Sequence, residues 1–401
     1  MEGVGRGHRI GSSGEKLMSI HDIRENHAKA KVQVAGLRER IQQSRARKAD
    51  TDDNRLLDAT VATYARAHGR RTVEISDDFR LCKTLQGHTG KIYSLDWAYQ
   101  AGDRIVSVAG DGRLIVWNAL TSQKTHAIKL PCQWVMACAF SPMGRSVACG
   151  GLDNTCSVFN LNSTPDADGN LPVSQALMGH KSYLSCCRYV PQMEQHIITS
   201  SGDETCMLWD AEHGQRISTF GGDSTSGHTA AVMSVSVSTN NTPQVFVSGS
   251  CDKTARLWDT RMRNAPHTYH GHEGDVNAVC LLPDGKRFGT ASDDGTCRLF
   301  DTRTGYQLQL YSHPREGDSV KVLAVAFSSS GRLMFAAYDN DDCFVWDTIT
   351  AEVVMNLANV SHGHTKRISC LGVCRDGSAL CTGSWDNTLK VWAFSGRGIH
   401  D

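Results

Sequence analysis

Residues 104–117 read Arg-Ile-Val-Ser-Val-Ala-Gly-Asp-Gly-Arg-Leu-Ile-Val-Trp, with β-branched and apolar residues on each side of an Asp-Gly pair. Two short apolar runs joined by Asp-Gly predict a β-hairpin. The hairpin closes on Trp117, and a Gly-His pair, Gly87-His88, precedes it. The same order of residues returns along the rest of the chain, so this hairpin is the unit that determines the fold.

Five segments carry the full pattern of a His, a Ser or Thr, an Asp and a closing aromatic residue. They are His88/Ser107/Asp111/Trp117, His180/Thr199/Asp203/Trp209, His228/Ser248/Asp252/Trp258, His272/Thr290/Asp294/Phe300 and His364/Thr382/Asp386/Trp392. Two degenerate copies end at Phe159 and Trp346. The closing aromatics at 117, 159, 209, 258, 300, 346 and 392 give a period of 42 to 50 residues. Seven units of that period predict a repeat architecture.

The spacing within each full copy predicts a chain of side-chain hydrogen bonds, which we call the tie. The Trp indole bonds the Ser or Thr hydroxyl, the hydroxyl bonds the His, and the His bonds the Asp, at about 1 kcal/mol for each neutral link. A catalytic His-Asp pair would not recur five times, so these residues are interpreted as structural.

The two degenerate copies lack most of the tie. Leu130 and Cys149 stand where His and Ser would be in the second copy, and Asn340 and Ala336 stand where Asp and Thr would be in the sixth. We expect these two units to be held by packing alone.

One four-stranded unit cannot bury both of its faces, so seven units are predicted to close radially into a ring. Residues 80–85 (Arg-Leu-Cys-Lys-Thr-Leu) read as a strand before the first Gly-His pair, and this strand is expected to complete the last unit. The fold class is therefore all-β, a seven-bladed β-propeller over residues 80–401.

The chain ahead of the ring changes character. Residues 1–14 read as a flexible tail, and residues 15–70 as a helical segment that begins with a heptad seam, apolar except for His27. The seam consists of Ile20, Ile23, His27, Ala30, Val34, Leu37 and Ile41. A seam can dock onto its own domain or onto a partner helix, but a closed propeller buries its own apolar surfaces. We therefore expect a coiled coil with a separate chain.

Composition excludes several classes of function. Lys plus Arg and Asp plus Glu both number 42, which argues against a surface dominated by nucleic-acid binding. The start, Met1-Glu2-Gly3, does not resemble a secretory signal, so the 15 cysteines are expected to be reduced thiols in a cytosolic protein. No zinc spacing and no nucleophile elbow occur in the sequence. We expect no enzyme, no metal and no cofactor.

Several strings outside the repeated pattern carry a more specific resemblance. They are Gln-Trp-Val-Met at 133–136, Ala-Cys-Gly-Gly-Leu-Asp-Asn at 148–154, Tyr-Leu-Ser-Cys-Cys-Arg at 183–188, Thr-Cys-Arg-Leu-Phe-Asp at 296–301 and Gly-Ser-Trp-Asp at 383–386. With the preceding coiled-coil helix and seven WD-type repeats, the chain resembles the heterotrimeric G-protein β subunit over nearly its whole length. Longer connections near 163–170, 223–226, 314–318 and 360–362, together with the extended amino terminus, resemble plant-type members.

The resemblance implies a scaffold that transduces signals from membrane receptors. The helix would pair with a γ subunit in an obligate dimer, and the prenyl group of γ would hold the dimer at the cytoplasmic face of the plasma membrane. One face of the ring would bind GDP-bound Gα and, once released, downstream effectors. The main alternative is a WD-repeat adaptor of a ubiquitin ligase or chromatin complex, which would normally carry a recruiting domain or a charged peptide pocket.

The resemblance also assigns residues to these contacts. The shared Gα and effector surface falls on Lys91, Tyr93, Trp134, Met136, Leu152, Asn154, Tyr183, Met233, Cys251, Asp275, Asn277, Asp293 and Trp385, and a contact with the Gα amino-terminal helix falls on Arg113, Ile115 and Lys124. Aromatic and Met side chains in turns, surrounded by Lys and Asp, are typical of an interface centre. Ala231 is neutral where the family usually has an acidic residue, so the resemblance does not support a salt link to Gα there.

Overall fold

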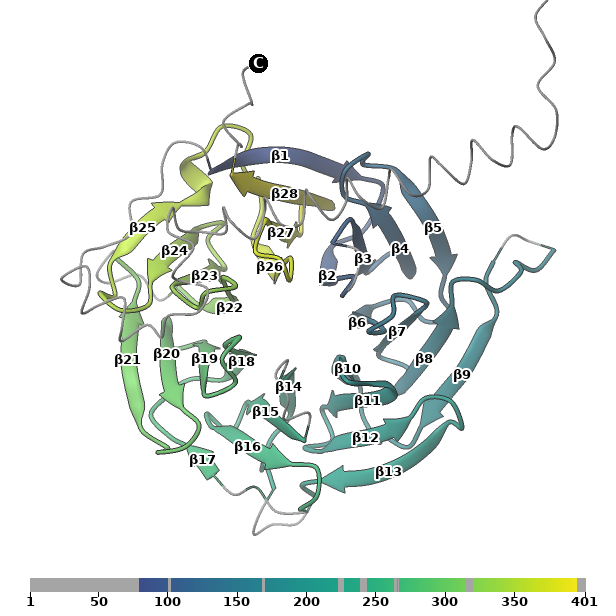
Figure 1. Ribbon diagram of the computed structural model, residues 1–401, viewed down its shortest axis with the longest axis horizontal. Coiled ribbons are helices and arrows are strands. Elements are labelled where there is room, and N and C mark those ends of the chain that lie inside the picture. Colours follow the sequence, from purple (N-terminus) through teal and green to yellow (C-terminus); the bar gives the residue numbers. More distant parts are fainter. Residues whose placement is uncertain are drawn as a thin grey trace, which may run out of the picture. The chain divides into compact units, whose positions relative to one another are not determined.

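The structure is a computed structural model that describes residues 79–99, 102–167, 170–222, 227–238, 244–262, 265, 267–314 and 320–394. The predicted tail at 1–14 and the predicted helical segment at 15–70, including the heptad seam, lie outside these residues. In the described part, seven four-stranded antiparallel sheets form the blades of a ring around a central opening (Figure 1). The predicted seven-bladed propeller is confirmed.

Six of the seven blades place their strands in sequence order from the central opening to the rim, and the seventh takes its outermost strand from the start of the ring. The first three blades are β2 (Ile92–Trp97), β3 (Arg104–Ala109), β4 (Arg113–Asn118) and β5 (Lys124–Lys129); β6 (Val135–Phe140), β7 (Ser146–Gly151), β8 (Thr155–Asn160) and β9 (Val173–Met178); and β10 (Leu184–Val190), β11 (Met193–Ser201), β12 (Cys206–Asp210) and β13 (Gln215–Phe220). The fourth and fifth are β14 (Val232–Val237), β15 (Val245–Ser250), β16 (Ala255–Asp259) and β17 (His267–Tyr269); and β18 (Val276–Leu281), β19 (Arg287–Ser292), β20 (Thr296–Asp301) and β21 (Gln307–Ser312).

The last two blades complete the circle. The sixth is β22 (Val322–Phe327), β23 (Leu333–Tyr338), β24 (Cys343–Asp347) and β25 (Val353–Asn356), followed by the 3-10 helix η2 (Leu357–Asn359). The seventh is β26 (Ile368–Val373), β27 (Ala379–Ser384), β28 (Thr388–Phe394) and β1 (Phe79–Gln86). The predicted closure is confirmed, because β1 pairs antiparallel with β28 from Phe79↔Phe394 to Gln86↔Thr388.

The predicted tie is present in the first blade with good geometry. Trp117 Nε1 donates to Ser107 Oγ at 2.8 Å, His88 Nε2 lies 2.8 Å from the same oxygen, and His88 Nδ1 lies 3.1 Å from Asp111. Asp111 also accepts from the backbone amide of Thr89 at 2.8 Å. The tie therefore joins the second and third strands of the blade to the loop that enters it.

The other four full copies repeat these contacts. The His Nδ1 to Asp distance is 2.9 Å for His180 and 2.7 Å for His228, His272 and His364. In the fifth blade Phe300 replaces Trp and has no N–H to donate, yet His272 still bonds Thr290 Oγ1 at 2.6 Å.

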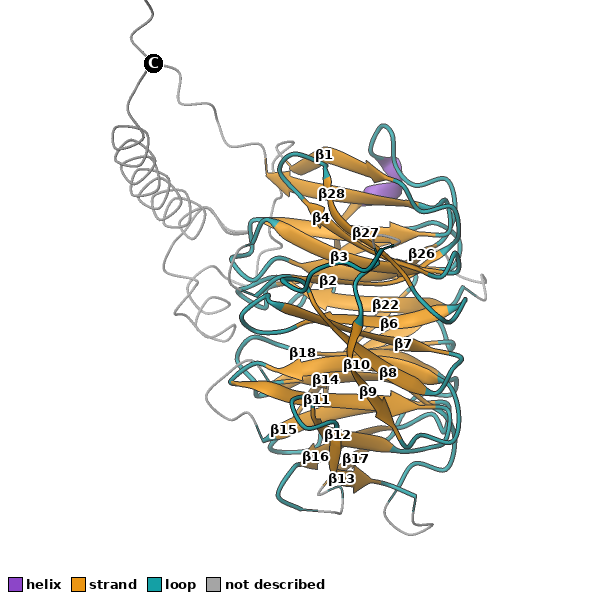
Figure 2. Cartoon of the chain, turned by 90° about the vertical axis from the view of Figure 1, so that its right-hand side faces the viewer, coloured by secondary structure: helices purple, strands orange, loops and turns teal. Residues whose placement is uncertain are grey.

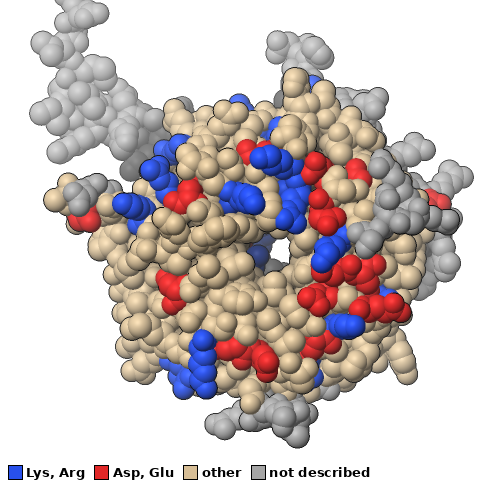
Figure 3. Space-filling view, turned by 180° about the vertical axis from the view of Figure 1, so that it is seen from behind, with Lys and Arg blue, Asp and Glu red and all other residues tan. Residues whose placement is uncertain are grey.

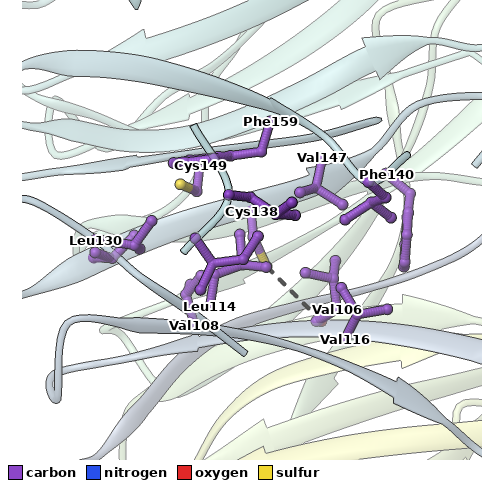
Figure 4. Close-up of a cluster of buried hydrophobic side chains, with 14 of the residues drawn as sticks. Val106, Val108, Leu114, Val116, Leu130, Cys138, Phe140, Val147, Cys149 and Phe159 are labelled. Atoms are coloured by element: carbon purple, nitrogen blue, oxygen red, sulfur yellow. Dashed lines mark hydrogen bonds between the residues drawn. The ribbon is translucent and has the colours of Figure 1, made fainter. Parts of the chain in front are cut away.

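The two degenerate blades differ from each other. In the second blade, Leu130 and Cys149 join an apolar cluster with Leu114 and Phe159, in line with the expectation of packing (Figure 4). The expectation of packing alone was wrong for the sixth blade.

In the sixth blade a different polar network replaces the tie. The carboxylate of Asp342 accepts from the side-chain amides of Asn340 and Asn356, at 2.8 Å each, and lies 3.5 Å from His313 Nε2. Arg332 and Asp347 form a second, buried ion pair in the same blade. Asn340 occupies the position of the tie Asp, and the carboxylate of this blade comes from Asp342, two residues later.

Apolar clusters fill the spaces between neighbouring blades. Side chains on one innermost strand also form hydrogen bonds with the backbone of the next. Ser94 and Asp96 on β2 accept from the backbone amides of Cys138 and Phe140 on β6, at 3.4 and 2.8 Å. The connections between strands collect on two opposite faces of the ring, as the edge-on view shows (Figure 2). No helix among the described residues is long and apolar enough to cross a membrane.

Candidate protein-interaction face

One face of the ring collects the loops that enter the innermost strands and the turns between the second and third strands; we call it the interaction face. All thirteen residues predicted for the Gα and effector surface lie on it, and none of them is buried. They come from every blade except the sixth. The structure thus brings together side chains that are spread over almost 300 positions of the sequence, from Lys91 to Trp385.

Two neighbouring positions recur on this face in six blades. The first position lies three residues after the His of the tie, or at Lys321 in the sixth blade. The second position directly follows the second strand and precedes the Asp of the tie, or Asn340 in the sixth blade. The backbone amide of the second position donates to the carbonyl of the first. The pairs are Gly110 to Lys91, Gly202 to Tyr183, Cys251 to Ala231, Asp293 to Asp275, Asp339 to Lys321 and Trp385 to Arg367, at 2.9 to 3.1 Å. We call these the paired loop positions.

An aromatic cluster occupies the face where the seventh, first and second blades meet. The ring of Tyr93 lies 6.1 Å from the ring of Trp134 and 6.1 Å from the ring of Trp385. Trp134 is 50% exposed and has a φ of 65°, a left-handed backbone that non-glycine residues seldom adopt. A strained, exposed aromatic residue is a candidate for function, because neither its burial nor its backbone energy explains its presence.

Two cations lie over the indole ring of Trp385. Lys91 Nζ lies 3.8 Å and the guanidinium carbon of Arg367 lies 3.3 Å from the ring centroid. Cation–π contacts of this kind are worth about 0.5–1 kcal/mol at exposed sites. Sequence reasoning missed Arg367, although it occupies the same paired loop position as Lys91 and could have been found from that register.

The middle of the arc is less polar. The hydroxyl of Tyr183 lies 3.8 Å from the sulfur of Met233, so the third and fourth blades touch on this face. Burial, together with the neighbouring Asp275, raises the pKa of the Cys251 thiol to about 12, so that this cysteine stays protonated. These side chains provide apolar contact area with little charge.

The fifth and sixth blades form an acidic part of the face. Asn277 donates to Asp293 at 2.6 Å and to the carbonyl of Val322 at 2.8 Å, while Lys321 pairs with Asp293. The backbone amide of Lys321 donates to Asp339 at 3.1 Å. Figure 3 shows acidic side chains gathered on the right of the central opening and Lys and Arg side chains above it. Lys321 and Asp339 were missed because the degenerate sixth repeat hid their register.

The three residues predicted to contact the Gα amino-terminal helix lie on β4 and at the start of β5, at the rim of the first blade. Arg113 and Lys124 are exposed, but Ile115 is 1% exposed and packs with Trp117 and Leu389. This side of β4 faces the seventh blade, so the side chain of Ile115 fills the space between the two blades, and its contact with a partner stays a prediction. The seven residues predicted for the γ coiled coil lie outside the described residues.

The exposed side chains of the interaction face are suited to contact with another protein. The pattern His residues point their nitrogens into the ties, and no group of three His, Cys, Asp or Glu side chains in the described part of the chain could hold a metal ion. The face presents exposed aromatic rings, the cations Lys91 and Arg367 beside Trp385, and a separate acidic region. Exposed aromatic and Met side chains surrounded by charge are typical of protein interfaces.

Comparisons with known proteins agree with this description. The model of a family described as G protein beta WD-40 repeat protein matches residues 29–393. The chain is 60% identical over 386 residues to a guanine nucleotide-binding protein subunit beta of Zea mays, covering 95% of this chain and 99% of that protein. Proteins of the same description from Oryza sativa subsp. japonica and Arabidopsis thaliana are 60% and 59% identical, each over 95% of this chain and 99% of the relative.

Proposed function

Because this chain belongs to the G protein β family of WD-40 repeat proteins and is a heterotrimeric G-protein β subunit, we propose that its interaction face binds the α subunit. The bound α would be in its GDP form, and effectors would use the same face after α leaves. The relatives named above are all plant proteins, in accord with the plant-type features of the sequence.

The observation that carries this proposal is the aromatic cluster clamped by cations. Trp385, Tyr93 and Trp134 come from three blades and remain accessible on one face, where Lys91 and Arg367 limit the motion of Trp385. A pre-ordered aromatic side chain loses little conformational freedom when a partner covers it, which is a common property of interface hot spots.

The proposed switch works by exposure of a rigid surface. The ties hold the loops of the interaction face to the second and third strands, so the face does not need to refold when a partner arrives or leaves. Alpha subunit and effector would compete for overlapping side chains. The ring itself acts as a scaffold without catalytic chemistry.

A γ subunit completes the proposed complex. Its helix would pair with the predicted heptad seam from Ile20 to Ile41, and a prenyl group on γ would bring the dimer to the cytoplasmic face of the plasma membrane. Signals from membrane receptors would then reach effectors through the freed face.

The central experiment measures binding of a GDP-loaded plant α subunit to the full chain purified with its γ subunit. We expect Trp385→Ala to weaken binding by about 2 kcal/mol or more, the loss typical of a hot spot. Leu120→Ala is the matched control, because Leu120 is 54% exposed in the turn between β4 and β5, on the opposite face. Both variants should keep the β-rich circular dichroism of the wild type. Equal affinity of wild type and Trp385→Ala would remove Trp385 from the binding surface.

A further inference from the structure

The outermost strands of the seven blades carry a very uneven distribution of charge. Four of their five Lys and Arg residues lie on two strands, Arg80 and Lys83 on β1 and Lys124 and Lys129 on β5; the fifth is Arg216 on β13. None of the seven outermost strands, all of which are described, contains an Asp or a Glu. The chain as a whole has no net charge, so this concentration is local.

The strand register turns these cations toward one another across the junction of the seventh and first blades. On β1, Lys83 is opposite Val391, whose side chain packs in the cluster between these blades. On the first blade, Arg113 is opposite Lys129, on the same side of the sheet as Ile115 of that cluster. Figure 1 shows β1 and β5 following one another along the outer edge of the ring.

Lys124 connects the two sides. Its Nζ lies 5.6 Å from the ring centroid of Trp117, and a Cβ placed on Gly87 would meet its Cε at 2.1 Å. Gly87 follows β1 directly, so the lysine side chain crosses from β5 toward the end of β1. We call Arg80, Lys83, Arg113, Lys124 and Lys129 the basic rim; all five are exposed.

Among the described residues, none of the nearby acids is paired with the basic rim. Between residues 79 and 135, the described acidic residues are Asp96, Asp103 and Asp111. Asp111 is engaged in the tie, Asp96 accepts from the amide of Phe140 near the central opening, and Asp103 precedes β3 at the opposite face. No ion pair joins any member of the basic rim to a described carboxylate. The five exposed cations therefore form one positively charged patch.

We propose that the basic rim of the dimer, when Arg113 and Lys124 are free of the α subunit, binds an anionic phospholipid surface and orients the ring on the membrane, an inference that rests on the membrane location given under the proposed function. The cations lie along a convex edge, on long side chains, which suits a broad negative surface. Three of the five are lysines, which act as point charges without the planar fork that recognises a single carboxylate. A single lipid chain gives only weak, reversible anchoring, and a polybasic patch is a common second signal.

The test uses the full chain produced with its γ subunit in bacteria, which add no prenyl group. Co-sedimentation is measured with vesicles of phosphatidylcholine alone and of phosphatidylcholine with phosphatidylserine. We expect binding only to the anionic vesicles, and loss of that binding as salt is raised. Lys83→Gln with Lys129→Gln should weaken partitioning by about fivefold for each lysine removed, or roughly 25-fold together.

The matched control is Lys181→Gln with Lys253→Gln, which removes two exposed lysines from the third and fourth blades. It should bind anionic vesicles like the wild type. Equal binding by both double variants, or equal binding to neutral and anionic vesicles, would overturn the proposal. Weaker binding of GDP-loaded α by the Lys83/Lys129 variant, with unchanged vesicle binding, would also overturn it and assign the rim to a protein contact. Failure of the wild type to bind α would instead count against the proposed function.

Discussion

The hydroxyl of Thr199 is the centre of a tie, and we expect Thr199→Val to destabilise the third blade by about 2–4 kcal/mol. Thr199 Oγ1 accepts from Trp209 Nε1 at 2.8 Å and lies 2.7 Å from His180 Nε2, and the residue is 0% exposed. Valine has nearly the same shape, so the substitution opens no cavity. It leaves two buried polar groups without their partner, and each unsatisfied group costs about 1–3 kcal/mol. We take the lower part of that sum because His180 keeps Asp203 at 2.9 Å.

Amide hydrogen exchange resolved by blade is the suitable assay, supported by urea unfolding. Units of a repeat protein contact mainly their neighbours, so loss of one tie should show first in β10 to β13. Thr268→Val on β17 is the matched control, because it makes the same chemical change outside any tie. We expect that control to stay within about 0.5 kcal/mol of the wild type.

Two results would refute this reasoning. If Thr199→Val changed the free energy of unfolding no more than Thr268→Val, the hydrogen bonds of the tie would not contribute to stability. If protection fell equally in all seven blades, the ring would unfold as one unit, and the assignment of the energy to a single blade would be wrong.

Two further predictions concern charge inside the blades. Burial opposes the ionisation of Asp111, yet its hydrogen bonds from His88 and from the Thr89 amide lower its pKa to about 2, below its value of about 3.9 in an unfolded chain. This carboxylate therefore stabilises the fold above about pH 4, and that contribution is lost as the pH falls toward 2; Asp111→Asn should remove this part of the acid sensitivity of the melting temperature, and an unchanged pH profile would contradict it. In the sixth blade, Asp347→Asn should cost about 3–5 kcal/mol by leaving the buried Arg332 without its carboxylate, while Arg332→Met combined with Asp347→Asn should restore most of the loss in urea unfolding, because Asn keeps the oxygen that accepts from the amides of Ile349 and Thr350. A double variant as unstable as the single one would show that packing, and not the unpaired charge, causes the defect.

The ring could be predicted from the sequence because its determinants are local and repeated. His, Ser or Thr, Asp and Trp recur at fixed spacing, and each tie forms within one blade, so period and spacing were sufficient. The sixth blade shows the limit of that reasoning. There Asp342, two positions after Asn340, supplies the carboxylate, and its partner Asn356 lies on a different strand, which a search for aligned positions could not reveal.

The site was harder to predict than the fold for a related reason. Exposed aromatic residues such as Trp134 and Trp385 could be identified by type, but exposure could not, and the burial of Ile115 follows from the packing of two blades that are distant in sequence. Arg367 was overlooked although it lies three residues after His364, as Lys91 lies after His88, and the backbone hydrogen bond from Trp385 to Arg367 showed that it is next to an aromatic residue already chosen. To predict the site, the alignment of equivalent positions between repeats was needed more than residue type.

The ties and the interaction face are parts of one arrangement. In the seventh blade, Asp386 of the tie accepts from the backbone amide of Thr365, two residues before Arg367, and follows Trp385 directly. The tie thus fixes the two loops that carry the paired loop positions, without using the side chains at those positions. Those side chains can differ from blade to blade at little cost to the fold: a cation beside an indole in the seventh blade, two carboxylates, Asp275 and Asp293, in the fifth. A repeated structural element therefore supports a surface that does not repeat, and an asymmetric partner such as a Gα subunit requires a surface of that kind.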